Sequence, residues 1–176
     1  MSEPLLVPYG TVARPVGFAV LIIDMQPEYF KKPTRRKRER MLAAQQQALA
    51  FCATIDIPVA MVEFGAEETI TEISASVHRV PRSVRLRKHS ADAFFETCLD
   101  EQLHAWHART LVLAGLVAGG CVLATARSAL SLDYNVRTSE ALIGDEDCDN
   151  LEITVDKWYR ERNLLIDPDM RLLFGS

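Results

Sequence analysis

Three side chains that could together perform covalent hydrolysis each lie at or just beyond the end of a segment predicted to be a strand. They are the carboxylate of Asp24, the ammonium of Lys88 and the thiol of Cys121. The segments are residues 17–23, 83–88 and 110–114. Functional groups of open α/β sheets gather at the carboxyl ends of the strands, so we expect these three side chains to meet there. A nucleophile, a base and a cation form a set that suits nucleophilic catalysis.

Each residue also has an ordinary structural explanation when it is taken alone. An aspartate at a strand end often caps a helix, a lysine there is usually a solvated charge, and a free cysteine is often buried. Cys121 carries a further signal, because it lies between a glycine-rich turn, residues 115–120, and a predicted helix, residues 122–132. A helix N-terminus can lower the pKa of a thiol and raise its thiolate fraction. The combination therefore favours a reactive cysteine.

The elements that must position these residues alternate between strand and helix along the chain. The predicted strands are residues 17–23, 58–62, 83–88, 110–114 and 135–139. The predicted helices are residues 34–53, 91–107 and 122–132, with a short helix or loop at 69–77, helical structure at one end of 145–160, and a strand or tail at 163–167. This alternation predicts a single domain over residues 1–176, a three-layer α/β/α sandwich with a mostly parallel, Rossmann-like sheet. Residues 1–15, which hold three prolines, are expected to form an extended N-terminal arm.

The composition argues against a nucleic-acid partner and against a membrane protein. The chain of 176 residues has a net charge of −4 and a pI of about 5.6, whereas nucleic-acid-binding domains are usually basic. A basic run at residues 31–40 is expected to be a solvated helix face or a rim that attracts an anionic substrate. The four cysteines form no CxxC or metal-type pattern, and there is no signal peptide or membrane-length apolar run. These features predict a cytoplasmic protein with reduced thiols.

Three stretches occur in an order that is specific when they are taken together. They are AVLIIDMQ at residues 19–26, KHSADAF at 88–94 and AGLVAGGCV at 114–122, followed by a continuation at 126–136. From about residue 17 to 140 the sequence resembles the isochorismatase-like cysteine hydrolase family, which includes nicotinamidases, carbamoylsarcosine amidase-type enzymes and isochorismatases.

The resemblance implies a catalytic triad of Asp24, Lys88 and Cys121. In the implied reaction, Cys121 attacks an amide-type carbonyl, Asp24 takes the thiol proton and returns it to the leaving amine, and Asp24 then activates the water that hydrolyses the acyl-enzyme. Lys88 is expected to keep Asp24 ionised and to favour the thiolate. The family also implies a cis peptide bond between Leu116 and Val117, which aims the backbone N–H groups of Val117 and Cys121 at the developing oxyanion.

The sequence departs from parts of the family pattern. Nicotinamidases have an Asp-x-His metal pair after the second strand and a further histidine before the lysine strand, but residues 63–68 here contain no histidine and His78 is a lone candidate. We therefore expect no metal and no cofactor. Ala118 stands where the family often has threonine, which could loosen the nucleophile turn. The segment 63–80 is shorter than in many members.

Four aromatic residues near the predicted strand ends are candidates for the substrate pocket, with core packing as the alternative: Tyr29, Phe30, Phe64 and Phe94. The resemblance as a whole implies a metal-independent cysteine hydrolase that cleaves a C–N bond in a small amide, carbamoyl or ureido compound and forms a homodimer or homotetramer. Two alternatives stay open. One is a catalytically silent scaffold that binds a small molecule or a partner protein, and the other is an isochorismatase-type vinyl-ether hydrolase, which needs no cysteine.

Overall fold

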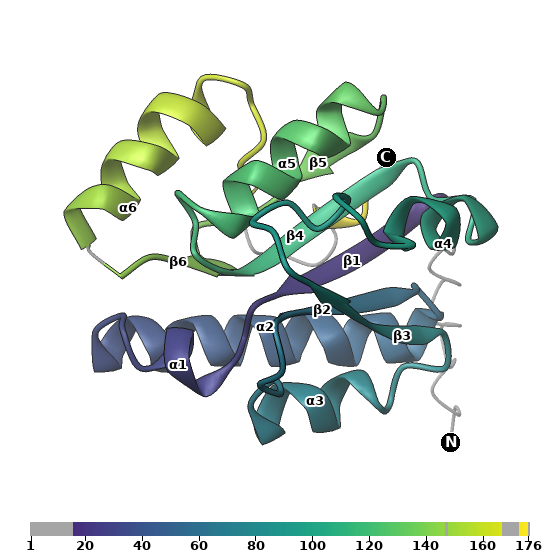
Figure 1. The fold of residues 1–176 in the computed structure, drawn as a ribbon, viewed down its shortest axis with the longest axis horizontal. Coiled ribbons are helices and arrows are strands. Elements are labelled where there is room, and N and C mark those ends of the chain that lie inside the picture. Colours follow the sequence, from purple (N-terminus) through teal and green to yellow (C-terminus); the bar gives the residue numbers. More distant parts are fainter. Residues whose placement is uncertain (1–15, 147, 167–172, 176) are drawn as a thin grey trace, which may run out of the picture.

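A parallel sheet forms the centre of the protein, as the alternating pattern predicts (Figure 1). The computed structural model describes residues 16–146, 148–166 and 173–175, so the expected arm at residues 1–15 lies outside the described residues. The strands are β1 (Phe18–Ile23), β2 (Val59–Phe64), β3 (Ser83–Lys88), β4 (Thr110–Leu116), β5 (Asn135–Arg137) and β6 (Ile143–Gly144). Their order is β3-β2-β1-β4-β5, with β6 also paired to β4, and all these pairings are parallel.

The centre of the sheet is the pair formed by β1 and β4. All six residues of β1 are buried, because a parallel strand between two helical layers is covered on both faces. The chain builds outward from β1 to β3 and then crosses back to place β4 on the other side of β1. The carboxyl ends of β1 and β4 therefore border the point at which the strand order reverses, where α/β sheets commonly bind ligands.

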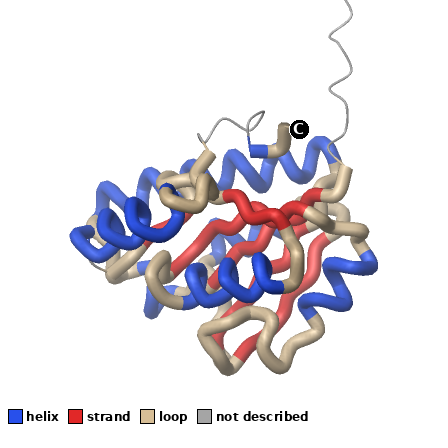
Figure 2. Tube along the Cα trace, turned by 90° about the horizontal axis from the view of Figure 1, so that it is seen from above, coloured by secondary structure: helices blue, strands red, loops and turns tan. Residues whose placement is uncertain are grey.

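Helices cover both faces of the sheet (Figure 2). One face packs against α2 (Arg35–Ile55) and α3 (Thr71–Val77), and the other packs against α4 (Leu99–Ala105), α5 (Cys121–Ser131) and the π-helical segment η1 (Val155–Arg160), which follows α6 (Cys148–Thr154). The alternation of β1 divides its side chains between the two layers: Ala19, Leu21 and Ile23 face α4 and α5, and Phe18, Val20 and Ile22 face α2 and α3. The three-layer arrangement is thus confirmed.

The helix predicted over residues 91–107 is wrong in its first half, because α4 begins only at Leu99. Side chains bind the backbone before that point and compete with helical hydrogen bonds. Asp92 Oδ1 accepts from the N–H of Phe94, and the hydroxyl of Thr97 donates to a carbonyl four residues earlier. Glu96 has a left-handed φ of 53°, which ends any helical run. Phe95 and Cys98, which lie in this non-helical part, are exposed.

Other element boundaries agree more closely with the sequence pattern. Thr34 caps α2 by accepting a hydrogen bond from the N–H of Lys37 at 3.3 Å. The short helix α1 (Pro27–Phe30) was not predicted. None of the helices in the described part of the chain combines the length and apolarity needed to cross a lipid bilayer.

Candidate active site

Lys88 and Asp24 form a buried ion pair across the end of the sheet. Lys88 Nζ lies 2.8 Å from Asp24 Oδ2, and each residue is only 1% exposed. Lys88 ends β3, and β2 lies between β3 and β1. The side chain of Lys88 must therefore cross over the end of β2 to reach Asp24, since neighbouring strands are about 4.8 Å apart. On the way its ammonium passes 4.9 Å from the centre of the Phe64 ring and donates to the carbonyl of Ser90 at 3.0 Å.

Cys121 completes this cluster as the first residue of α5. Its thiol hydrogen-bonds with the carboxylate of Asp24. Burial, then the negative charge of Asp24 and this hydrogen bond, raise the pKa of Cys121 to about 11, although Lys88 acts in the opposite direction. Lys88 thus acts in the expected direction, but burial and Asp24 outweigh it, so the pKa of Cys121 is raised and not lowered as expected. At neutral pH the resting thiol keeps its proton.

Asp24 is held in an unusual backbone conformation that turns its carboxylate toward the other two residues. Its φ is 51°, and its N–H donates to the carbonyl of Val62 at 2.9 Å. Burial raises the pKa of Asp24, against the lowering effect of Lys88 and Cys121. Oδ1 of Asp24 is buried and has no further partner among the described residues. The carboxylate therefore keeps one unsatisfied acceptor oxygen, and its raised pKa makes it a stronger base than an ordinary aspartate.

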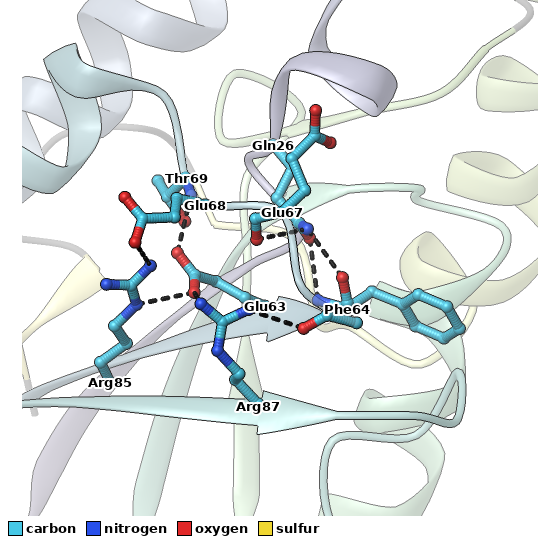
Figure 3. A network of polar contacts seen from close by, with 9 residues as sticks. Gln26, Glu63, Phe64, Glu67, Glu68, Thr69, Arg85 and Arg87 are labelled. Carbon is cyan, nitrogen blue, oxygen red and sulfur yellow. Dashed lines mark hydrogen bonds and ion pairs between the residues drawn. The ribbon is translucent and has the colours of Figure 1, made fainter.

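Gln26 ties the end of β1 to the end of β2 and so fixes the segment that carries Asp24 (Figure 3). Its amide nitrogen donates to the carbonyls of Phe64 and Glu67, each at 2.8 Å, and its Oε1 accepts from the N–H of Phe64 at 2.8 Å. The sequence reasoning quoted Gln26 but gave it no role. The available signal was a polar residue two positions after the proposed base.

The turn before Cys121 has the backbone conformation that the family implies. The peptide bond between Leu116 and Val117 is cis, which confirms that expectation. Gly115 has a φ of +127°, and a Cβ atom there would lie 1.9 Å from the carbonyl oxygen of Ile23. In the described structure, neither the N–H of Val117 nor that of Cys121 donates to a protein acceptor. Both remain predicted oxyanion donors.

Residues beyond β6 fasten the same turn, and the sequence reasoning missed them. The N–H of Ala118 donates to Gly144 at 2.7 Å, and the carbonyl of Ala118 accepts from the hydroxyl of Tyr159 at 2.9 Å. The N–H of Gly119 donates to Asp145 Oδ2 at 2.9 Å. The sequence shows an acidic segment that begins at residue 145. No sequence pattern links this segment to the turn at residues 115–120.

The four candidate pocket aromatics occupy different environments. The pKa of Tyr29 is raised by burial and by the nearby charges of the triad carboxylate and thiol, so its hydroxyl lies near the cluster. Phe64 lies beside the triad lysine. Phe30 packs at the edge of the core between the sheet and α2. Phe94 is directed elsewhere, because its ring stacks on Tyr134 with a centroid distance of 6.0 Å.

At the place of the nicotinamidase metal pair, Glu63 is neutralised by guanidinium groups (Figure 3). Its carboxylate, fully buried, accepts from Arg85 at 2.7 Å and from the N–H of Thr69 at 2.6 Å, and Arg87 lies at 3.6 Å. Although burial opposes it, these bonds hold the pKa of Glu63 below its usual value. Both carboxylate oxygens of Glu63 are thus already bound by hydrogen-bond donors, and guanidinium groups beside them do not fit a site for a divalent cation. Within the described ranges, no three His, Cys, Asp or Glu side chains are grouped to hold a metal.

Comparison with known proteins agrees with the fold. The sequence model of the isochorismatase domain matches residues 18–147. The isochorismatase family protein YddQ of Bacillus subtilis is 30% identical over 128 residues, which are 66% of this chain and 71% of that protein.

Solved structures share the same architecture at lower sequence identity. A nicotinamidase of Staphylococcus aureus superposes with a TM-score of 0.75 at 16% identity, covering 86% of this chain and 99% of that one. The N-carbamoylsarcosine amidase of Thermoplasma acidophilum gives a TM-score of 0.71 at 22% identity, covering 88% and 98%. On the strength of the domain match over most of its length, the chain belongs to the isochorismatase family of hydrolases.

Proposed function

We propose that the protein is a cysteine hydrolase that cleaves a C–N bond in a small amide, carbamoyl or ureido compound, without a metal. One observation carries the proposal: the thiol of Cys121 hydrogen-bonds with a buried carboxylate, Asp24, that is itself paired to Lys88 at 2.8 Å. A silent scaffold has no need of such a cluster, since burying an ion pair stabilises a fold little or not at all. The amidases among the structural neighbours support the choice of bond.

The proposed reaction begins with proton transfer from the Cys121 thiol to Asp24 as the sulfur attacks the carbonyl carbon. Asp24 then gives this proton to the leaving nitrogen, the C–N bond breaks, and an acyl-enzyme thioester remains. Asp24 next removes a proton from a water molecule, which attacks the thioester and releases the acid and the Cys121 thiolate, to which the proton returns. Lys88 keeps the carboxylate ionised at the start of each half-reaction.

The backbone N–H groups of Val117 and Cys121 are the proposed donors to the oxyanion. Their freedom from protein acceptors in the described structure supports this role, because an oxyanion hole must keep its donors unpaired until the substrate arrives. Tyr29 and Phe64 are the aromatic residues proposed to line the pocket, since both lie beside the cluster.

The test is a screen of primary amides, N-carbamoyl amino acids and ureas for ammonia release by the wild-type protein and by Cys121→Ala. Cys98→Ala is the matched control, because Cys98 is an exposed free cysteine away from the triad. We expect activity in the wild type and in Cys98→Ala and its loss in Cys121→Ala. Activity that survives in Cys121→Ala would contradict the proposal and would favour vinyl-ether hydrolysis, which needs no cysteine. Inertness toward every compound would favour the scaffold.

We also propose that the protein works in the cytoplasm as a homodimer or homotetramer. A catalytic thiol requires a reducing compartment, and Cys52, Cys98 and Cys121 are free thiols. Light scattering that gives a mass near the 19.7 kDa of one chain would contradict the oligomer. Recovery of the protein outside the cytoplasmic fraction of its cell would contradict the location.

A further inference from the structure

We propose that Asp145 and Tyr159 are positioning residues that hold the nucleophile turn in the shape needed for the oxyanion hole. This inference rests on the proposed hydrolase function, because it assigns the two residues a part in that reaction. Both lie beyond β6, far from the triad in sequence, and both bind the backbone of residues 118–119, between the two predicted oxyanion donors, Val117 and Cys121.

The contacts of Asp145 and Tyr159 are buried and directional. Tyr159 is fully buried and donates its hydroxyl to the carbonyl of Ala118 at 2.9 Å. Asp145 is 7% exposed, and its two oxygens accept from the N–H of Gly119 at 2.9 Å and from the N–H of Glu146 at 2.7 Å. A buried carboxylate that accepts two backbone N–H bonds is fixed in orientation, so it can hold a turn more firmly than a solvent-exposed contact can.

These hydrogen bonds involve some of the backbone polar groups of the turn and leave the two predicted oxyanion donors unpaired in the described structure. The peptide unit between Ala118 and Gly119 is bound on both sides, at its carbonyl by Tyr159 and at its N–H by Asp145. The N–H of Ala118 is bound as well, by the carbonyl of Gly144. The turn is therefore anchored through the groups that do not face a substrate carbonyl, while the donors on either side of it stay unpaired in the described structure.

The same contacts account for the absence of a threonine at position 118. A threonine hydroxyl in the turn could brace it from within, and Ala118 has no polar side chain to do so. Within the turn, the carbonyl of Val117 accepts from the N–H groups of Gly120 and Val122, and Asp145 and Tyr159 add bonds from outside it. Gly119 is part of this arrangement, because a Cβ atom there would lie 3.2 Å from Asp145 Oδ2 and 3.1 Å from Thr154 Oγ1.

Two reactions of Cys121 separate positioning from mere structural support. Acylation by p-nitrophenyl acetate forms a thioester and releases p-nitrophenol through a tetrahedral oxyanion, whereas alkylation by iodoacetamide forms a thioether and releases iodide without one. Both need the thiolate, so the ratio of the two rates at Cys121 cancels any change in thiol ionisation. The initial rate of p-nitrophenol release, less that of Cys121→Ala, gives the acylation rate, because water then hydrolyses the thioester. Peptide mapping by mass spectrometry gives the rate of alkylation at Cys121 alone.

The variants are Tyr159→Phe and Asp145→Asn, each of which removes one bond to the turn. Matched controls are Tyr134→Phe, which removes a tyrosine–aspartate hydrogen bond of 2.7 Å elsewhere in the fold, and Asp100→Asn, which takes the charge from its acceptor. We expect the ratio of acylation to alkylation to fall about 10- to 100-fold in the two turn variants, because a small displacement of oxyanion donors has effects of this order. The controls should keep the wild-type ratio.

An unchanged ratio in both turn variants would overturn the inference, and so would an equal fall in the controls, which would indicate general softening of the fold. A wild-type Cys121 that is alkylated but never acylated would instead overturn the proposed hydrolase function, and the inference with it. The two failures are therefore distinguishable in one set of measurements.

Discussion

Replacing Asp24 with asparagine should make Cys121 more reactive toward a simple alkylating reagent while abolishing hydrolysis. Asparagine keeps the size of the side chain but removes the negative charge and the charged acceptor that, after burial, raise the pKa of Cys121 to about 11. Lys88 then loses its carboxylate partner, and its ammonium continues to favour the thiolate. Every electrostatic change in Asp24→Asn therefore lowers the pKa of the thiol.

The size of the effect follows from the fraction of thiol that is ionised. At pH 8 a thiol with a pKa near 11 is ionised to ~0.1%, and each unit by which its pKa falls raises that fraction about tenfold. Removing a charge in direct contact changes a pKa by about 1–3 units, so alkylation at pH 8 should become at least 10-fold faster. Hydrolysis should fall by about 10²- to 10⁴-fold, the usual contribution of a general base.

The assay is iodoacetamide labelling across pH, with the modified peptides quantified by mass spectrometry. Exposed Cys98 serves as an internal reference in both proteins, because the substitution lies outside its surroundings. The midpoint of labelling at Cys121 should move to lower pH in Asp24→Asn, while that of Cys98 stays in place. Slower or unchanged labelling of Cys121 in Asp24→Asn would refute the argument that the carboxylate keeps the thiol protonated.

Three further predictions concern stability and can be measured by urea unfolding. Lys88→Met should lower the free energy of unfolding by about 3–5 kcal/mol, since it leaves a fully buried carboxylate without its partner. Gly115→Ala should lower the free energy of unfolding by about 3 kcal/mol or more, because the φ of Gly115 is +127° and the new Cβ would lie 1.9 Å from the carbonyl oxygen of Ile23. The control is Gly65→Ala, where φ is +66° and no atom lies near the new Cβ, so the loss should be only about 1–2 kcal/mol. Burial raises the pKa of Cys52 from 9.0 to about 12, so the folded state keeps a proton that the unfolded state loses above pH 9. The free energy of unfolding should therefore fall by about 1.4 kcal/mol between pH 7.5 and pH 10. Cys52→Ala should remove this part of the pH dependence.

The sequence was sufficient to predict the sheet and the meeting of Asp24, Lys88 and Cys121, because both depend on short-range patterns. A strand buried on both faces is a continuous apolar run, and the first polar residue after it marks the end of the strand, as at Asp24. Parallel strands bring such ends together without further information. The helix over residues 91–107 was predicted too long for the opposite reason. Asp92 and Thr97 bind the backbone locally, and periodicity alone does not reveal those bonds.

The ionisation of Cys121 could not be predicted, because its sign depends on a competition that only the three-dimensional structure decides. A helix N-terminus and a lysine both lower a thiol pKa, and the sequence displays both. Burial and the proximity of Asp24 act in the other direction, and here they prevail. The proposed positioning contacts of Asp145 and Tyr159 were missed for a related reason, because they join residues far apart in the sequence. The contact of Asp145 spans 26 positions and that of Tyr159 spans 41.

The protonated thiol decides how the proposed nucleophile must be generated. Forming a free thiolate at pH 7 from a group with a pKa near 11 would cost about 5 kcal/mol before any bond to the substrate forms. If the proton passes to Asp24 while the sulfur attacks, no free thiolate has to form first. Burial raises the pKa of Asp24 and so makes it a better acceptor for this proton. Burial of the cluster thus keeps the thiol unreactive at rest and also strengthens the base that activates it when a carbonyl is in place.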